Sequence, residues 1–296
     1  MLSRLSANAR AYARRIVPDP AVHWLRRKIR EREIDRLARL RPELLALHGS
    51  FTASQLIAFL RGAGVRQNGI LFVQCSYNDL VTYVGTAYEL VSALIDFAGR
   101  SGTLLMPAYS SNMWQTPCRP FDARREPTNA GIVAELFRRE EGVIRSVHPR
   151  HSICGIGPRA TELLSGHEDC VYADGEGSPF DRIRKLQAQS ICLGMPPGFT
   201  SFCHWVEDIQ PDKYPIRAHD GPMECELTNA EGQKMVRLFY RRRGGQRSNE
   251  ALLGRKLPPP ALQCLQFHGI QICKYEWPML ATELMALRDQ GIVPFR

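Results

Sequence analysis

Residues 69–107, GILFVQCSYNDLVTYVGTAYELVSALIDFAGRSGTLLMP, contain two short apolar segments with a helical pattern between them. Ile70–Gln74 is apolar and strand-sized, and Cys75–Asn78 follows it as a loop. A helix is predicted at about Ala87–Ala98, and a glycine-containing turn leads from it into a second apolar strand, Thr103–Pro107. Strand, helix and strand in this order predict neighbouring parallel strands that helices cover.

Signals for helices and strands extend on both sides of this segment. Thr52, with Gln55 three residues later, is a typical helix start, and this helix is predicted to run to about Gly62. The predicted fold class is α/β, with a central mixed, largely parallel sheet flanked by helices, an antiparallel C-terminal section and an N-terminal helical extension. The other predicted elements are a helix at Gly131–Arg139, a strand at Ser190–Gly194, antiparallel runs at Met223–Thr228, Lys234–Tyr240 and Gly269–Tyr275, and a helix at about Pro278–Gln290.

The composition is that of an ordinary globular protein. Of 296 residues, 44% are hydrophobic and 23% are charged, which excludes a disordered chain, a fibre and a short disulfide scaffold. No run of about 18 apolar residues exists, so no membrane-spanning helix is predicted.

The net charge of +9 is concentrated at one end of the chain. Met1–Arg41 hold 12 basic and 4 acidic residues, whereas the rest of the chain holds 27 and 26, so nucleic-acid binding is not predicted for it. We predict a basic helical extension over residues 1–48, with helices at 5–16 and 21–41, and a separate domain over residues 49–296. The extension is interpreted either as a solvated appendage or as a basic surface that meets a membrane or an acidic partner.

The nine cysteines indicate a reducing compartment. Their number is odd, no CxxC pair occurs, and most lie in apolar surroundings, which predicts buried free thiols rather than disulfides. Met1–Val17 lacks the apolar core of a secretory signal, so the predicted location is the cytoplasm.

Three segments carry residue types that suit binding of a phosphate or of a developing negative charge. Cys75–Asn78 leaves a strand toward a helix, where backbone N–H groups can serve as donors. Arg145–Pro149 combines arginine, serine and histidine in a proline-stiffened segment, which could bind a phosphate or a pantetheine amide. Ser178 precedes Pro179 and can begin a helix. Each segment alone is equally compatible with an ordinary structural loop.

His204 and Glu207 are the candidates for acid–base chemistry. They are three residues apart and share a face if this segment is helical. A carboxylate beside an imidazole raises the pKa of the imidazole and fixes its tautomer, which suits a general base, although such a pair is also common as a purely structural histidine. No second ligand cluster and no HExxH motif accompany the pair, so no metal is predicted. Cys75 and Cys154 are minority candidates for a nucleophile.

The order and spacing of these motifs resemble the antibiotic N-acetyltransferases, the family of aminoglycoside 3-N-acetyltransferases. The resemblance is close over residues 52–210, looser toward the C-terminus and absent from the N-terminal extension. The matching positions are Phe72–Ser76, Gly102–Pro107, Gly131, Phe137, Arg138, Arg145, Ser146, His148, Pro149, Ser152, Gly155–Pro158, Ala160, Gly177–Pro179, Leu193, Gly194, Thr200, His204 and Glu207.

The resemblance implies transfer of an acyl group from acyl-CoA, in the first instance acetyl-CoA, to an amine, through a ternary complex and without an acyl-enzyme. His204 matches the family's catalytic base and Glu207 its support. Chemistry agrees, because a base near neutral pKa must take a proton as the amine nitrogen attacks the thioester. Ser76 is also a candidate donor to the leaving thiolate. The residues that match regions holding the CoA arm and its phosphates are Cys75, Ser76, Tyr77, Asn78, Arg145, Ser146, His148 and Ser178.

Some positions depart from the family pattern. Gln74 stands where the family commonly has His, Val81 where it has Gly, and Gly85-Thr86 where it has a glycine pair. The run Arg241–Arg243 is interpreted as a solvated hairpin, or as a contact with an anionic acceptor or with CoA phosphates. The predicted acceptor is an amino group of an aminosugar or aminoglycoside-like small molecule. The identity of this acceptor and the acyl group that is donated to it stay open.

Two alternatives to this enzyme remain. One is a cysteine-dependent acyltransferase or hydrolase that uses Cys75, and the other is a non-catalytic binding protein that uses the basic N-terminus. Contact of residues 1–41 with a membrane or an acidic partner, and assembly into a homo-oligomer, also stay open.

Overall fold

The computed structural model describes residues 19–114, 116–243 and 250–294. By its internal contacts the chain divides into two units, with the boundary between Gly49 and Ser50. The first unit contains α2 (Asp19–His48), which agrees with the predicted helical extension, while the predicted helix at 5–16 lies outside the described residues. None of the described helices combines the length and the apolar character that a membrane span requires.

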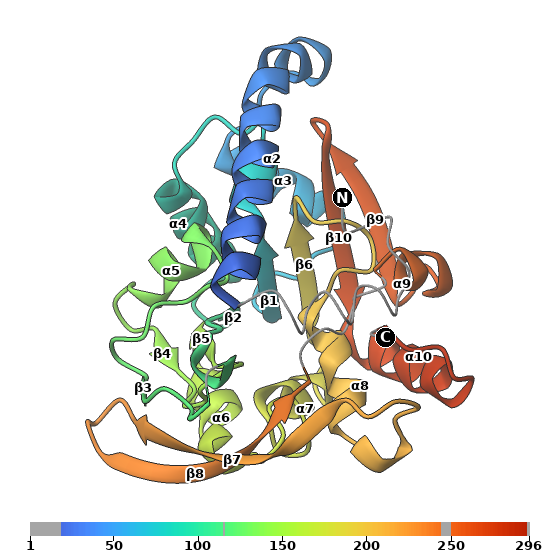
Figure 1. The fold of residues 1–296 in the computed structure, drawn as a ribbon. Helices are drawn as coiled ribbons and strands as arrows, with labels where there is room; N and C mark the ends of the chain where they lie inside the picture. The colour runs from blue at the N-terminus through green and yellow to red at the C-terminus, as the bar shows by residue number, and fades with distance from the viewer. Residues whose placement is uncertain (1–18, 115, 244–249, 295–296) are drawn as a thin grey trace. The chain divides into compact units, whose positions relative to one another are not determined.

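The second unit is built on a seven-stranded mixed sheet in the order β4-β5-β2-β1-β6-β10-β9 (Figure 1). The central strand β1 (Ile70–Cys75) pairs in parallel with β2 (Thr103–Pro107) and with β6 (Gln189–Leu193). The outer strands pair antiparallel to their neighbours, which confirms the predicted mixed sheet with an antiparallel C-terminal section. These outer strands are β4 (Ile144–Arg145), β5 (Ile153–Ile156), β9 (Leu262–Phe267) and β10 (Ile270–Glu276).

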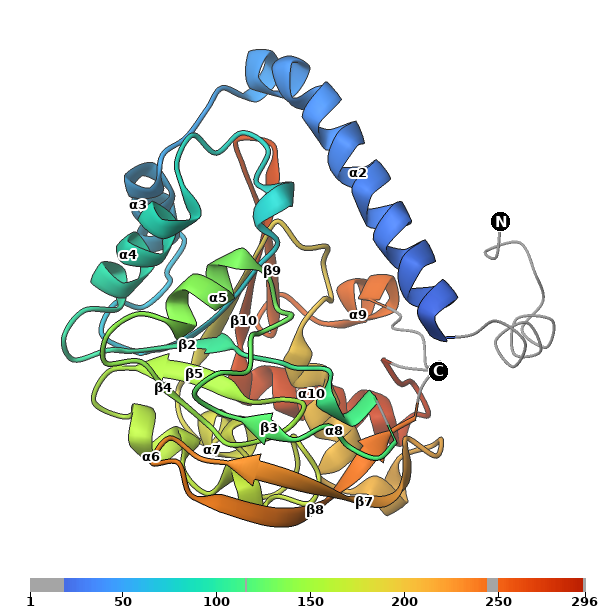
Figure 2. The same cartoon turned by 60° about the vertical axis from the view of Figure 1, so that its left-hand side comes forward.

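Helices cover both faces of this sheet, which is why its central strands are apolar on both sides. Leu71 and Val73 of β1 point into one hydrophobic cluster, and Phe72 between them points into the other. The first face carries α3 (Ala53–Gly62), α4 (Ala87–Ala98) and α5 (Ile132–Arg138), of which α3 and α4 lie side by side (Figures 1 and 2). The second face carries α6 (Ala160–Leu164), α7 (Pro179–Arg184), α8 (Trp205–Asp208), α9 (Glu250–Lys256) and α10 (Trp277–Asp289).

Capping boxes fix the starts of α3 and α4. The Thr52 side chain accepts from the backbone N–H of Gln55, whose side chain in turn accepts from the Thr52 N–H, as the sequence predicts. Thr86 and Glu89 form the same arrangement at α4. The backbone N–H groups of Thr86 and Glu89 are therefore used by the helix itself.

A second sheet of three strands, β3 (Phe121–Asp122), β7 (His219–Thr228) and β8 (Lys234–Arg242), lies beside the first one and has its own small core. Cys118 and Cys225 form a disulfide in that core. This corrects the prediction that all cysteines are free thiols. The pairing of β3 with β7 brings together two cysteines 107 positions apart, which local sequence cannot reveal.

Short 3₁₀ helices connect several of these elements. They are η2 (Tyr77–Asp79), η3 (Asn112–Trp114), η4 (His167–Asp169), η5 (Ser201–His204) and η6 (Pro211–Lys213).

Candidate active site

His204 is the last residue of η5, and the chain continues from it directly into α8. Gln74, near the end of β1, holds the start of this segment: its side-chain amide donates to Ser201 Oγ at 2.8 Å, and its carbonyl oxygen accepts from the Ser201 N–H at 3.1 Å. Thr200 caps η5 by accepting from the Phe202 N–H. The histidine is thus fixed to the centre of the sheet, and Gln74 has a structural task at the position where the family commonly has His.

Glu207 lies one helical turn beyond His204 on the same face. Its Oε2 is 3.1 Å from Nδ1 of His204, and the carboxylate is completely buried. The Tyr214 hydroxyl donates to Oε1 at 3.3 Å, and Nε of Arg242 lies 2.7 Å from Oε2. Because the carboxylate occupies Nδ1 and orients the ring, proton transfer falls to the other ring nitrogen, Nε2.

Arg242, at the end of β8, lies between three buried carboxylates. Besides Glu207, its guanidinium donates to Asp208 Oδ1 at 2.9 Å and to Asp174 Oδ2 at 3.4 Å. Only 5% of Arg242 is exposed. The interpretation of Arg241–Arg243 as a solvated hairpin is therefore wrong for Arg242, because the alternation of the strand turns this side chain inward.

A second imidazole–carboxylate pair lies next to the first one. Nδ1 of His151 is 2.7 Å from Asp174 Oδ2, and the ring centroids of His151 and His204 are 5.4 Å apart. The Tyr109 ring stacks on His151 with a centroid separation of 4.6 Å. Sequence reasoning missed this pair because 23 residues separate its members.

Burial controls the electrostatics of these groups. It lowers the pKa of both His204 and His151 well below the usual value, and the nearby guanidiniums of Arg150 and Arg242 act in the same direction. Burial also raises the pKa of Glu207 to about 7 and that of Asp174 to about 6, the second with help from the Asp208 charge. At neutral pH both imidazoles are therefore unprotonated. The prediction that the Glu207 carboxylate raises the pKa of His204 is wrong, because burial and the nearby guanidiniums lower it.

Cys75–Asn78 continues from the end of β1. The Ser76 hydroxyl donates to Asp79, the Tyr77 hydroxyl donates to the Gly85 carbonyl oxygen at 2.8 Å, and Asn78 is exposed. Burial, with the Asp79 charge, raises the pKa of Cys75 far above that of an ordinary thiol. The thiolate form that a nucleophile needs is therefore disfavoured at Cys75.

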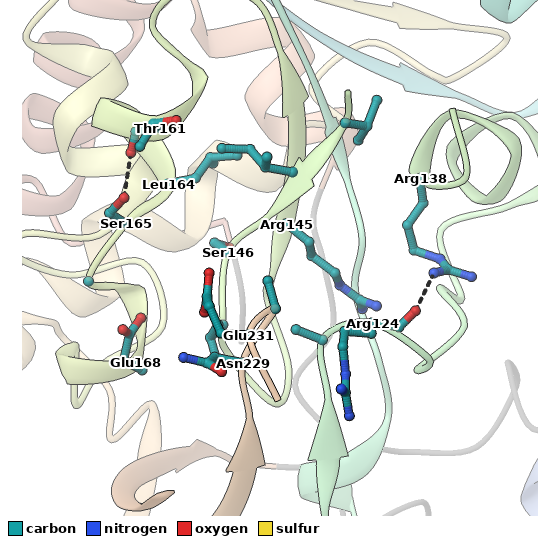
Figure 3. Close-up of a pocket in the computed structure, with 16 residues that line it drawn as sticks. Arg124, Arg138, Arg145, Ser146, Thr161, Leu164, Ser165, Glu168, Asn229 and Glu231 are labelled. Carbon is teal, nitrogen blue, oxygen red and sulfur yellow. Dashed lines mark hydrogen bonds between the residues drawn. The ribbon is translucent and has the colours of Figure 1, made fainter. Parts of the chain in front are cut away.

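Arg145 and Ser146 line a cavity of about 470 Å³ (Figure 3). Arg124 and Arg138 line the same space, together with Glu168, Asn229 and Glu231. The Arg145 guanidinium donates to Ser152 Oγ and to the backbone oxygens of Glu126 and Ala108, which are neutral acceptors. In the described part of the chain no carboxylate forms an ion pair with Arg145, so an anionic ligand would meet an uncompensated charge here.

His148 and Ser178 are buried and have structural tasks. Nδ1 of His148 accepts from the backbone N–H groups of Arg150 and His151, each at 3.1 Å, which fixes the turn that presents the His151 side chain. Ser178 caps α7 by accepting from the Asp181 N–H. Of the predicted cofactor-binding residues, only Arg145 and Ser146 line the 470 Å³ cavity.

No cluster of three or more histidine, cysteine, aspartate or glutamate side chains suited to a metal ion occurs within residues 19–114, 116–243 and 250–294.

Comparison with known proteins gives consistent matches to acetyltransferases. The family model described as Aminoglycoside 3-N-acetyltransferase matches residues 72–255, which is more than half of the chain. Aminoglycoside N(3)-acetyltransferase IV from Salmonella sp is 28% identical over 189 residues, which cover 63% of this chain and 67% of that protein. Aminoglycoside N(3)-acetyltransferase III from Salmonella sp is 27% identical over 174 residues, which cover 53% of this chain and 60% of the relative.

Solved structures share the fold at low identity. Aminoglycoside acetyltransferase AAC(3)-Xa matches with a TM-score of 0.69 at 19% identity, covering 86% of this chain and 98% of that one. AAC-IIIb, in a binary complex with CoASH, matches with a TM-score of 0.67 at 18% identity, covering 82% and 98%. A variant of AAC(3)-IVa in complex with a gentamicin matches with a TM-score of 0.67 at 21% identity, covering 81% and 89%.

Proposed function

This chain belongs to the aminoglycoside 3-N-acetyltransferase family, and from that premise we propose that residues 49–296 transfer an acyl group, in the first instance acetyl, from acyl-CoA to an amino group. The acceptor is an aminosugar or an aminoglycoside-like molecule. The complexes of AAC-IIIb with CoASH and of AAC(3)-IVa with a gentamicin support both substrate classes.

The observation that carries the proposal is the pairing of His204, whose side chain is 18% exposed, with the fully buried Glu207. An unprotonated imidazole whose Nδ1 faces a carboxylate uses Nε2 as its proton acceptor. As the amine nitrogen attacks the thioester carbon, His204 takes a proton from the nitrogen, and Glu207 stabilises the imidazolium that forms. The C–N bond forms, the C–S bond breaks, and the imidazolium returns its proton to the leaving thiolate. No covalent acyl-enzyme is needed.

The arginines of the 470 Å³ cavity suit the phosphates of CoA. Arg124 and Arg138 already form ion pairs with Asp122 and Glu135. The hydrogen bonds of the Arg145 guanidinium go to neutral acceptors instead, so its charge is the one we assign to a CoA phosphate. We assign Cys75–Asn78 to the acyl-bearing end of the CoA arm, because this loop and η5 are both anchored at the end of β1. His148 and Ser178 support these elements from within.

The buried state of Cys75 opposes the alternative of a cysteine nucleophile. Burial and the Asp79 charge both raise the pKa of its thiol, so the thiol stays protonated at neutral pH. A trapped acyl-enzyme on Cys75 is therefore not expected.

The test is a thiol-release assay with acetyl-CoA and a panel of acceptors that contrasts cationic aminoglycosides with nucleotide-linked aminosugars. His204→Asn should lower turnover by about 100-fold or more while CoA still binds, because general-base catalysis of this kind contributes that much. His268→Asn is the matched control, since His268 lies in the turn between β9 and β10, where its ring packs against Phe51 and Phe267 and not against His204 or Glu207. Unchanged turnover in folded His204→Asn would contradict the assignment of the base.

A further inference from the structure

We propose that His151 is a second proton acceptor of this site, which removes the proton that a protonated acceptor amine must lose before its nitrogen can attack. The inference rests on the proposed function and deepens it. It assigns the two protons of the reaction to two different imidazoles.

The first observation is the position of His151. Its ring centroid is 5.4 Å from that of His204, so the two rings are close enough for one small amino group to contact both. Nδ1 faces Asp174 at 2.7 Å. No hydrogen bond within the described residues involves Nε2 of His151. The His151 side chain keeps 8% of its surface exposed. Nε2 of His148, by contrast, is buried without a hydrogen-bond partner.

The second observation is that the surroundings hold His151 in one orientation and one tautomer. The Asp174 carboxylate accepts a hydrogen bond from Nδ1–H, and this tautomer has its lone pair on Nε2. Asp174 is itself fixed, because its backbone N–H donates to Asp208 at 2.9 Å and its carboxylate accepts from Arg242. Tyr109 stacks on the ring. The His151 ring is thus held directly by Asp174 and Tyr109, and indirectly by the two contacts that fix Asp174.

The charged groups that face His151 favour its unprotonated form at rest. Burial lowers its pKa most, the cations of Arg150 and Arg242 and the ring of His204 add to this effect, and Asp208 opposes it. Once a proton arrives, Asp174 stabilises the imidazolium at 2.7 Å. His151 is therefore unprotonated before the acceptor binds, and the Asp174 carboxylate supplies the opposite charge when His151 becomes an imidazolium.

The proton balance of the reaction gives this second acceptor a task. An ammonium acceptor and acetyl-CoA give an amide, a free thiol and one released proton. The first proton passes from the ammonium group to Nε2 of His151, and a neutral amine remains. His151 then releases this proton to water. The second proton passes from the attacking nitrogen to His204 and on to the thiolate. A single imidazole would have to release the first proton before it could take the second, because a neutral ring has only one nitrogen that accepts a proton.

The experiment compares two acceptors in the thiol-release assay with acetyl-CoA. One is an aminosugar whose amine is protonated at pH 7, and the other is an O-substituted hydroxylamine, whose nitrogen is neutral at that pH. With the aminosugar, His151→Gln should lower kcat/KM at pH 7 by about 100-fold. This deficit should shrink as the pH rises toward the pKa of the amine, and the hydroxylamine should react at the wild-type rate. His204→Asn should lose both reactions.

Two further variants separate catalysis from folding. Asp174→Asn keeps the shape of the side chain and should show the same dependence on acceptor and pH as His151→Gln. His167→Gln removes another buried imidazole, which bonds to Ser146 and to the Ala173 carbonyl oxygen, and any loss should be equal for both acceptors at every pH.

Three results are decisive against these ideas. Wild-type activity of His151→Gln on the aminosugar at pH 7 overturns the role of His151. So does an equal loss with both acceptors. Absence of thiol release by the wild-type protein with every acceptor instead contradicts the proposed function, and the second acceptor with it.

Discussion

Arg242 supplies the positive charge for three buried carboxylates, and its removal should cost more than any other single change in the site. Asp174, Glu207 and Asp208 all lie within 3.4 Å of its guanidinium nitrogens, and all three are buried. Charges in such surroundings are tolerated only when they are compensated. The same guanidinium contributes to the lowered pKa of both imidazoles, so it acts on stability and on proton transfer together.

We expect Arg242→Met to lower the free energy of unfolding by about 3–5 kcal/mol, because it leaves buried charges without a partner. Arg241→Met is the neighbouring control. Arg241 is about one-third exposed and pairs with Asp220 at 3.5 Å, so its loss should cost under about 1 kcal/mol. Urea unfolding of both variants measures the difference. Equal costs would show that Arg242 does not hold the cluster together.

The sequence could identify His204 and Glu207 but not the groups around them. A separation of three residues along one continuous helical segment is a local signal, which can be read without knowing the fold. His151 and Asp174 are 23 positions apart, and Arg242 and Asp208 are 34 apart. Such contacts depend on how strands and loops from different parts of the chain meet, and no local spacing encodes them.

At the scale of elements, the join between β1 and η5 sets the position of His204, the base that we propose. Gln74 makes two hydrogen bonds to Ser201, three residues before His204. Because η5 is a single short turn, it has little rigidity of its own. Its position therefore depends on the strand to which it is tied.

Gln74→Leu should lower kcat by about tenfold, since two hydrogen bonds of about 0.5–1.5 kcal/mol each no longer hold the base in place. Gln189→Leu is the matched control: Gln189 is a buried glutamine of the neighbouring strand, and it bonds to Arg66, Gly64 and Glu276 instead. Both variants should lose similar stability in thermal unfolding. A kcat for Gln74→Leu no lower than that of the control would contradict the role of this join.

Elements with strong local signals were predictable, whereas contacts between elements were not. The helix at Ala87–Ala98 has a capping box, regular apolar spacing and Gly99 after its end, and the structure has the same bounds. The strands at Ile70 and Thr103 are short apolar runs between turns, and they are confirmed. The Cys118–Cys225 disulfide was missed, because a parallel pairing of two distant strands brings its cysteines together.

For the whole molecule, the buried histidines predict a loss of stability in mild acid. Burial lowers the pKa of His148, His151, His167 and His204, that of His167 to about 4. The unfolded chain takes up protons on these four groups near pH 6.5, and the folded chain does not. The raised pKa values of Glu207 and Asp174 act in the opposite direction, but they are only two groups.

We therefore expect the free energy of unfolding to fall as the pH is lowered from 7 to 5, measured by urea unfolding at constant ionic strength. In His167→Gln this fall should be smaller, because one of the four histidines no longer titrates in the unfolded chain. A protein as stable at pH 5 as at pH 7 would show that the folded state protonates these rings as readily as the unfolded one.

The wide spacing of the charge cluster along the chain also bears on how the protein is made. A ribosome releases Asp174, Glu207 and Asp208 well before it releases Arg242, which ends β8. Until then, burial of the three acids would leave them without an opposite charge, which is strongly unfavourable in free energy. We therefore expect this side of the sheet to stay open to water during synthesis and to close around His204 only when the hairpin of β7 and β8 has been made.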